Sequence, residues 1–81
     1  MTLNEFIRSL TKQERQKLAE QAGCSFNYLN NLTNDNKLAS LELTSKIFRS
    51  SFNKNLPKEE RFLEPDYLAY RTKIRAHRKA L

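Results

Sequence analysis

The chain has little of what β-sheets and disulfide-stabilised folds require. Its single glycine, Gly23, and its two prolines, Pro57 and Pro65, leave few residues suited to tight β-hairpin turns. Its single cysteine, Cys24, excludes an intrachain disulfide and a cysteine-based metal cluster. We therefore expect a helical protein that works in a reducing, cytoplasmic environment.

Long apolar runs are also missing, so we expect no membrane-spanning helix. The first residues contain an early acid, Glu5, and no apolar block, which is unlike a secretory signal. With 81 residues, the chain is long enough for one domain with a small core. Its stability would gain from dimerisation.

The positive charge is concentrated near the C-terminus. The net charge is +6, but residues 1–66 hold ten Lys or Arg against nine Asp or Glu, which leaves only +1. The remaining residues contain no acid and five bases, namely Arg71, Lys73, Arg75, Arg78 and Lys79. This segment either contacts phosphates or is a solvated helix face or tail.

Capping signals divide the first part of the chain into helices. Thr2 with Glu5, and Thr11 with Glu14, form the capping-box pattern that begins a helix. Apolar residues follow at helical spacing, namely Leu3, Phe6, Ile7 and Leu10 in the first helix and Leu18, Ala19 and Ala22 in the second. Gly23 is placed to end the second helix in the left-handed conformation.

Further capping residues predict the rest of the fold. Ser25 should begin a helix with Phe26, Leu29 and Leu32 at helical spacing, and Ser40 should begin one whose inward residues are Leu43, Ile47, Phe48 and Phe52. Residues 53–56 should be a loop, and Pro57 should start a short helix over 58–63. From Pro65 a last helix should run toward Lys79, with apolar residues Tyr67, Leu68, Ile74 and Leu81. We expect an all-α bundle of about five short helices in residues 1–63, followed by a basic helix or tail in 64–81.

Residues 15–32 have the pattern of a helix-turn-helix. Ala19 is small enough for a second helix to cross against it, and Gly23 permits a tight reversal. Cys24 is expected to be buried between the two helices. The second helix then presents Ser25, Phe26, Asn27, Asn30 and Asn31 outward.

Asparagines on this helix favour a role in DNA recognition. Asparagine is a poor helix former, but its adjacent donor and acceptor match the edge of adenine. Phe26 either touches a thymine methyl or staples the helix to the core, and Tyr28 either donates to a phosphate or packs. The candidate DNA-binding residues are Arg15, Gln16, Ser25, Phe26, Asn27, Tyr28, Asn30, Asn31, Asn36 and Lys37, with phosphate contacts from Arg71, Arg75 and Arg78.

These residues resemble the Cro/repressor-type (XRE-like) helix-turn-helix regulators over about residues 3–52. The matching positions are Leu18, Ala19, Gly23, Ser25, Leu29 and Leu32, then Ser40-Leu41-Glu42-Leu43 and Lys46-Ile47. Leu63-Glu64-Pro65-Asp66 is also similar to the small prophage Cro-like proteins of the YdaS type. The resemblance implies a lambda-repressor-like fold and a repressor in a bacterial cytoplasm, or in the host cytoplasm if phage-encoded.

Three positions depart from the family pattern. Arg15 stands where the family usually has a DNA-contacting glutamine, and Ala39 replaces a usual proline. Asp35, between two asparagines, occupies the place of a turn glycine. Because Asn and Asp tolerate the left-handed conformation best among non-glycines, we expect this turn to survive.

We expect a transcriptional regulator that binds a double-stranded operator as a homodimer, inserting residues 25–32 into the major groove. The C-terminal helix could follow the DNA backbone, form the dimer contact through Tyr67, Leu68, Tyr70 and Ile74, or be a mobile tail. The alternative is a protein-interaction module, such as an antitoxin or a phage-encoded inhibitor. The near-neutral charge of residues 1–66 favours that alternative.

The sequence shows no chemistry of other classes. His77, the one histidine, lacks partners at metal-ligand spacing, and there is no nucleophile elbow or glycine-rich phosphate loop. We expect no enzyme activity, cofactor, metal or small-molecule ligand.

Overall fold

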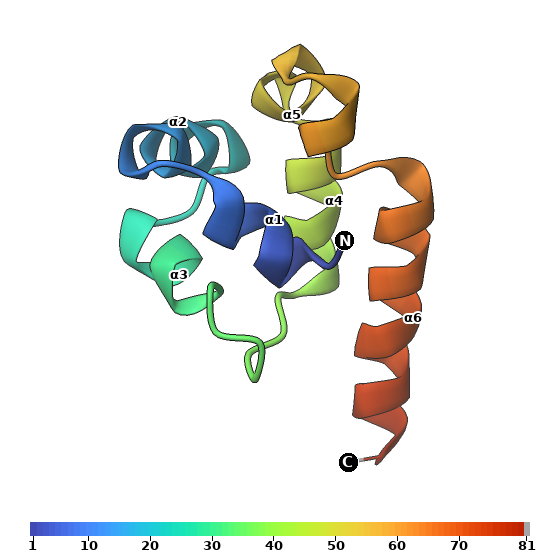
Figure 1. The fold of residues 1–81 in the computed structure, drawn as a ribbon. Coiled ribbons are helices and arrows are strands. Elements are labelled where there is room, and N and C mark those ends of the chain that lie inside the picture. The colour runs from blue at the N-terminus through green and yellow to red at the C-terminus, as the bar shows by residue number, and fades with distance from the viewer. Residues whose placement is uncertain (81) are drawn as a thin grey trace.

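A computed structural model describes residues 1–80 and places them in six α-helices and one 3-10 helix (Figure 1). The α-helices are α1 (Leu3–Ser9), α2 (Lys12–Ala22), α3 (Phe26–Asn31), α4 (Leu41–Arg49), α5 (Ser51–Asn55) and α6 (Glu64–Ala80), and the 3-10 helix covers Lys58–Glu60. Because residues 1–80 contain no strand, the prediction of a small all-α bundle is confirmed. None of these helices has both the length and the apolar character needed to cross a membrane.

Hydroxyl side chains begin the helices, as the sequence predicts. The Thr2 side chain accepts a hydrogen bond from the Glu5 N–H at 3.1 Å, and the Glu5 carboxylate accepts one from the Thr2 N–H. The other predicted caps accept backbone N–H groups at 3.1–3.2 Å and are Thr11, Ser25 and Ser40. Each cap satisfies an amide that the first helical turn leaves without a partner.

Gly23 ends α2 in the left-handed conformation, with φ of 71°. Within residues 1–80 no other residue has a positive φ. The expectation that an Asn or Asp near Asp35 turns the chain in the left-handed conformation is therefore wrong. Residues 32–40 join α3 to α4, and we call them the α3–α4 connection. Long-range hydrogen bonds from Asn4 and Tyr70 hold this connection.

The segment after α4 differs from the prediction. Helix α4 stops at Arg49, and Ser50 caps a separate helix, α5, across much of the expected loop 53–56. The buried side chain of Asn53 accepts from the Phe62 N–H at 2.9 Å and donates to the Phe62 carbonyl at 2.9 Å. These two bonds hold Phe62 in a non-helical conformation, so only Lys58–Glu60 forms a 3-10 turn where a helix over 58–63 was expected.

One hydrophobic core unites all six helices with Phe62. Its buried apolar residues are Leu3, Phe6, Ile7, Leu10, Leu18, Ala19, Ala22, Leu29, Leu32, Ala39, Leu43, Ile47, Phe62, Tyr70 and Ile74. Helix α5 joins it through the partly buried Phe52. Phe62 is fully buried, with its ring centroid 6.1 Å from that of Phe6 and 6.4 Å from that of Tyr70.

Helix α6 packs against α1 and α4 and shares the core with residues 1–63 (Figure 1). Tyr70 and Ile74 are buried in this core, so their predicted part in a dimer contact is wrong, because a partner cannot reach them. Tyr67 stacks on Phe48 of α4 at 4.5 Å between ring centroids. Leu68, another apolar residue of this helix, is 48% exposed. The predicted apolar residue Leu81 lies outside the described residues.

Candidate nucleic-acid interface

Helices α2 and α3, joined by the turn at Gly23, form the candidate recognition unit. Leu29 of α3 is fully buried and anchors the helix to the core. On the opposite side, Asn27, Tyr28 and Asn31 are exposed. Phe26 is partly buried but is not among the residues packed against the core, so it does not staple α3 to the core. The candidate recognition helix therefore presents a polar, uncharged surface.

Arg15 holds the recognition helix in place through bonds within the chain. Its Nε donates to the Ile7 carbonyl at 3.0 Å, and its Nη2 donates to the Arg8 carbonyl at 3.1 Å. Its Nη1 donates to Oδ1 of Asn30 at 3.1 Å. Arg15 was predicted as a DNA contact, whereas these bonds make it a bridge between the end of α1 and α3.

The Arg15 bond separates Asn30 from the other two asparagines of α3. Oδ1 of Asn30 accepts from Arg15, which fixes this side chain and leaves the oxygen one further lone pair. Asn27 and Asn31 are exposed, and within residues 1–80 their side chains make no hydrogen bond. On α3, Asn27 and Asn31 are thus the exposed asparagines whose side chains have no partner within residues 1–80.

Other predicted contacts lie near α3. Gln16 is exposed on α2, and Ser25 is exposed but uses its hydroxyl oxygen as the α3 cap. Asn36 and Lys37 are exposed on the α3–α4 connection. There, the Asn36 N–H donates to Oδ1 of Asn34 at 2.9 Å. The structure thus brings α3 and this connection together into one surface.

A buried polar network, not predicted from the sequence, supports the connection from inside. The side-chain nitrogen of Asn4, which is 1% exposed, lies 2.8–3.1 Å from three backbone carbonyl oxygens, those of Leu32, Asn34 and Lys37, which share its two hydrogens. The Tyr70 hydroxyl donates to Oδ1 of Asn4 at 3.0 Å and accepts from the Ala39 N–H at 3.1 Å. We call these two side chains and the four backbone groups the Asn4–Tyr70 network. The burial of Asn4 could have been predicted from the sequence, because Asn4 precedes Ile7 by three residues and therefore lies on the same face of α1.

Burial raises the pKa of the Tyr70 hydroxyl above that of a free tyrosine, and this effect outweighs the lowering by its hydrogen bond with Ala39. Because the folded-state pKa is raised, the stabilisation is fully present below about pH 10 and is lost as pH rises through the folded-state pKa. We expect the free energy of unfolding in urea to fall more between about pH 9 and pH 11 for the wild type than for Tyr70→Phe. An equal fall in both proteins would contradict the neutral, buried state of this hydroxyl.

The basic residues of α6 lie apart from α3. Figure 1 shows α6 on the far side of α1 and α4 from α2 and α3, with its C-terminal end at the same end of the bundle as the α3–α4 connection. Arg71 is held over the Tyr67 ring, with its guanidinium carbon 5.4 Å from the centroid. Arg75 and Arg78 are exposed. The predicted contacts thus form two groups, one on α3 and its connection and one on α6.

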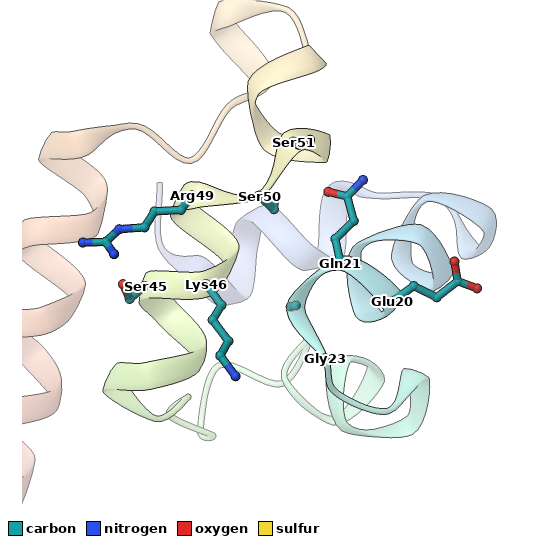
Figure 2. A pocket seen from close by; sticks show the side chains of 9 residues that line it. Glu20, Gln21, Gly23, Ser45, Lys46, Arg49, Ser50 and Ser51 are labelled. Carbon is teal, nitrogen blue, oxygen red and sulfur yellow. The ribbon is translucent and has the colours of Figure 1, made fainter.

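An open groove of about 610 Å³ separates the end of α2 from α4 (Figure 2). From α4, Lys46 extends toward the end of the bundle where α3 lies, while Arg49 extends toward α6. Lys46 pairs with Glu42 at 3.2 Å. The charged residues that line this groove are two bases, Lys46 and Arg49, and one acid, Glu20.

The sequence predicts no chemical role for Cys24 or His77, and the two residues differ in their surroundings. Cys24, predicted to be buried between the two helices, packs against the core but is only partly buried. Burial raises its pKa more than nearby Lys46 lowers it, which disfavours the reactive thiolate. His77 is exposed, and within residues 1–80 no three His, Cys, Asp or Glu side chains are grouped to hold a metal ion.

A search of protein-family models found no match to this chain, and neither did searches of curated proteins and of solved structures.

Proposed function

We propose that this chain is a sequence-specific, double-stranded DNA-binding regulator that inserts α3 into the major groove. The observation that carries the proposal is the exposed pair Asn27 and Asn31 on a helix whose other face is anchored by Leu29 and Arg15. A B-DNA major groove is about 12 Å wide and admits an α-helix, and an asparagine can bind the N6 and N7 atoms of adenine. Helix α3 carries no charge, so it suits base edges better than phosphates.

We assign phosphate contacts to Lys37 and to two arginines of α6. Lys37 is exposed on the α3–α4 connection, which follows the recognition helix in the chain. Arg75 and Arg78 belong to the C-terminal end of α6, which lies at the same end of the bundle as this connection (Figure 1). These residues would contact the flanking backbone, which fixes the register of a protein on DNA without reading sequence.

A homodimer on a two-fold symmetric operator is the assembly we propose. One recognition helix reads few base pairs, and a second half-site multiplies affinity and specificity. Repression by covering a promoter is the mode of action we propose, since a bound dimer would occupy the operator. Such a protein would act as a small Cro-like repressor.

The test begins with selection of preferred duplexes from a randomised DNA library, followed by titration of the selected duplex. We expect Asn27→Ala and Asn31→Ala each to weaken binding to the selected duplex by about 1–3 kcal/mol, because each removes contacts to a base edge. Binding to an unrelated duplex should not change. Fluorescence anisotropy with both duplexes measures the two affinities.

A matched control is Asn55→Ala, which removes an exposed asparagine from α5, at the other end of the bundle from the α3–α4 connection (Figure 1). It should leave both affinities unchanged. Equal weakening of the two duplexes by the α3 variants would show that Asn27 and Asn31 do not read bases. A salt titration adds a second check, because three phosphate contacts from each protomer of the homodimer predict a slope of about −5 in log K against log salt.

A second candidate function is a protein-interaction module. The lack of charge on α3 and the near-neutral balance of residues 1–66 favour it. Because phosphate attraction dominates non-specific DNA binding, a DNA-binding protein should bind duplexes at low salt. Failure to bind any duplex at about 50 mM salt would reject the DNA-binding proposal and leave this second candidate.

A further inference from the structure

The Asn4–Tyr70 network joins the two ends of the α3–α4 connection to one side chain of α6. At its start, the Asn4 nitrogen holds the carbonyls of Leu32 and Asn34, and it also holds that of Lys37. At its end, the Tyr70 hydroxyl holds the Ala39 N–H, next to the cap of α4. The same hydroxyl donates to Asn4, so both ends depend on one phenol.

We infer that Asn4 and Tyr70 are positioning residues for DNA recognition, which set the path of the α3–α4 connection and thereby the placement of Lys37 and the end of α3. This inference rests on the proposed function. Neither side chain touches the outer surface, because Asn4 is 1% exposed and Tyr70 is 2% exposed. Their effect on binding would therefore pass entirely through the connection.

Besides the network, buried Leu32 and Ala39 and partly buried Leu38 anchor the connection to the core, and Nη1 of Arg8 donates to the Thr33 carbonyl at 3.1 Å. Within residues 1–80 the only residue with a positive φ is Gly23, so no left-handed turn fixes the connection. Its own backbone bonds are local, such as Lys37 N–H to the Asn34 carbonyl at 3.0 Å. The ion pair of Asp35 with Arg8 at 3.0 Å is largely exposed to solvent and so contributes little.

A consequence concerns the role of α6. The basic residues of this helix suggest a phosphate-binding element only, but Tyr70 gives it a second role inside the protein. By holding the connection, α6 would affect which sequence is preferred, whereas its arginines would affect all duplexes equally. The two roles are separable, because the hydroxyl is buried and the arginines Arg75 and Arg78 are exposed.

The experiment compares Tyr70→Phe with the matched control Tyr67→Phe, since the Tyr67 hydroxyl makes no hydrogen bond within residues 1–80. Each protein is examined without DNA by amide hydrogen exchange, and with DNA by titration of the selected and the unrelated duplex. For Tyr70→Phe we expect about tenfold faster exchange at Ala39 and in residues 33–38, since a buried donor loses its partner. We also expect about a tenfold loss of preference for the selected duplex, with unrelated binding unchanged.

The outcomes separate this inference from the proposed function. If the wild type shows no preference among duplexes, the proposed function fails, and the inference fails with it. If the wild type has a preference that Tyr70→Phe retains in full, only the inference is overturned. A uniform rise in exchange across all helices would also overturn it, because the effect would then be global destabilisation. An equal loss of preference in Tyr67→Phe and Tyr70→Phe would also overturn the inference.

Discussion

Asn4→Asp is expected to lower the free energy of unfolding by about 3 kcal/mol or more at pH 7, although the two side chains have nearly the same shape. The Asn4 nitrogen lies 2.8–3.1 Å from three carbonyl oxygens. The substitution puts a carboxylate oxygen there, so a buried charge would face three acceptors and have no donor at that side. Urea unfolding of both proteins measures the difference.

The pH dependence of this variant provides an internal check. Burial among carbonyls would raise the pKa of the introduced carboxyl above about 3.9, and its protonated form could donate one hydrogen bond. The destabilisation should therefore be smaller at about pH 4 than at pH 7. The control Asn27→Asp changes an exposed residue in the first turn of α3, where the cost should be below about 1 kcal/mol. Equal effects in both variants would contradict the bonding assigned to Asn4.

Phe62→Ala is expected to lower the free energy of unfolding by about 3–5 kcal/mol. Phe62 is fully buried between Phe6 of α1 and Tyr70 of α6, so its removal leaves a cavity where these helices meet. Thermal or urea unfolding followed by circular dichroism measures the loss. The control Leu68→Ala truncates a side chain that is 48% exposed and should cost less than about 1 kcal/mol.

Proteolysis shows where the Phe62 variant is loosened. Because Phe62 supports the packing of α6, trypsin should cut the variant after Arg71 or Lys73 under conditions in which the wild type is intact. A loss of stability below about 1 kcal/mol would mean that α6 is held without Phe62. Cleavage first in α2 would place the weakened contacts elsewhere.

The helix starts could be predicted from the sequence because their determinants are local. A capping hydroxyl bonds to an amide three residues later, so Thr2 with Glu5 and Thr11 with Glu14 contain the whole interaction within one turn. Gly23 was predictable for the same reason, since a left-handed φ at a helix end depends mainly on the residue itself.

Elements that depend on distant partners were not predictable. The bond between Tyr70 and Asn4 spans 66 positions in the sequence, and Asn53 binds the backbone of Phe62 nine positions away. The apolar stripe of α6 is thin, so the sequence could not show that the buried residue is Tyr70 and the exposed one Leu68. The spacing of apolar residues indicates a helix, but which face of that helix is buried depends on the elements that pack against it.

In the candidate site, too, some features can be predicted from the sequence and others depend on distant partners. The exposure of Asn27 and Asn31 follows from the helical spacing of Leu29 and Leu32, which can be read from the sequence. The bond between Arg15 and Asn30 joins two helices and cannot be read in this way. A long, many-donor side chain such as arginine can serve a backbone carbonyl or a phosphate equally well, and only the fold decides between them.

The distance in sequence between Tyr70 and Asn4 also has a consequence for the order of events during synthesis. Contacts between residues far apart in the chain form late, because much of the chain must already be present. Helices α1 to α3 are complete by Asn31, but the hydroxyl that joins Asn4 to Ala39 is 39 residues further on. At the usual rate of about 5–20 residues per second, a few seconds separate the synthesis of Asn31 from that of Tyr70, so the network closes only after this delay. A translation product that ends before Tyr70 would lack the hydroxyl that holds the α3–α4 connection and the part of the core that α6 supplies.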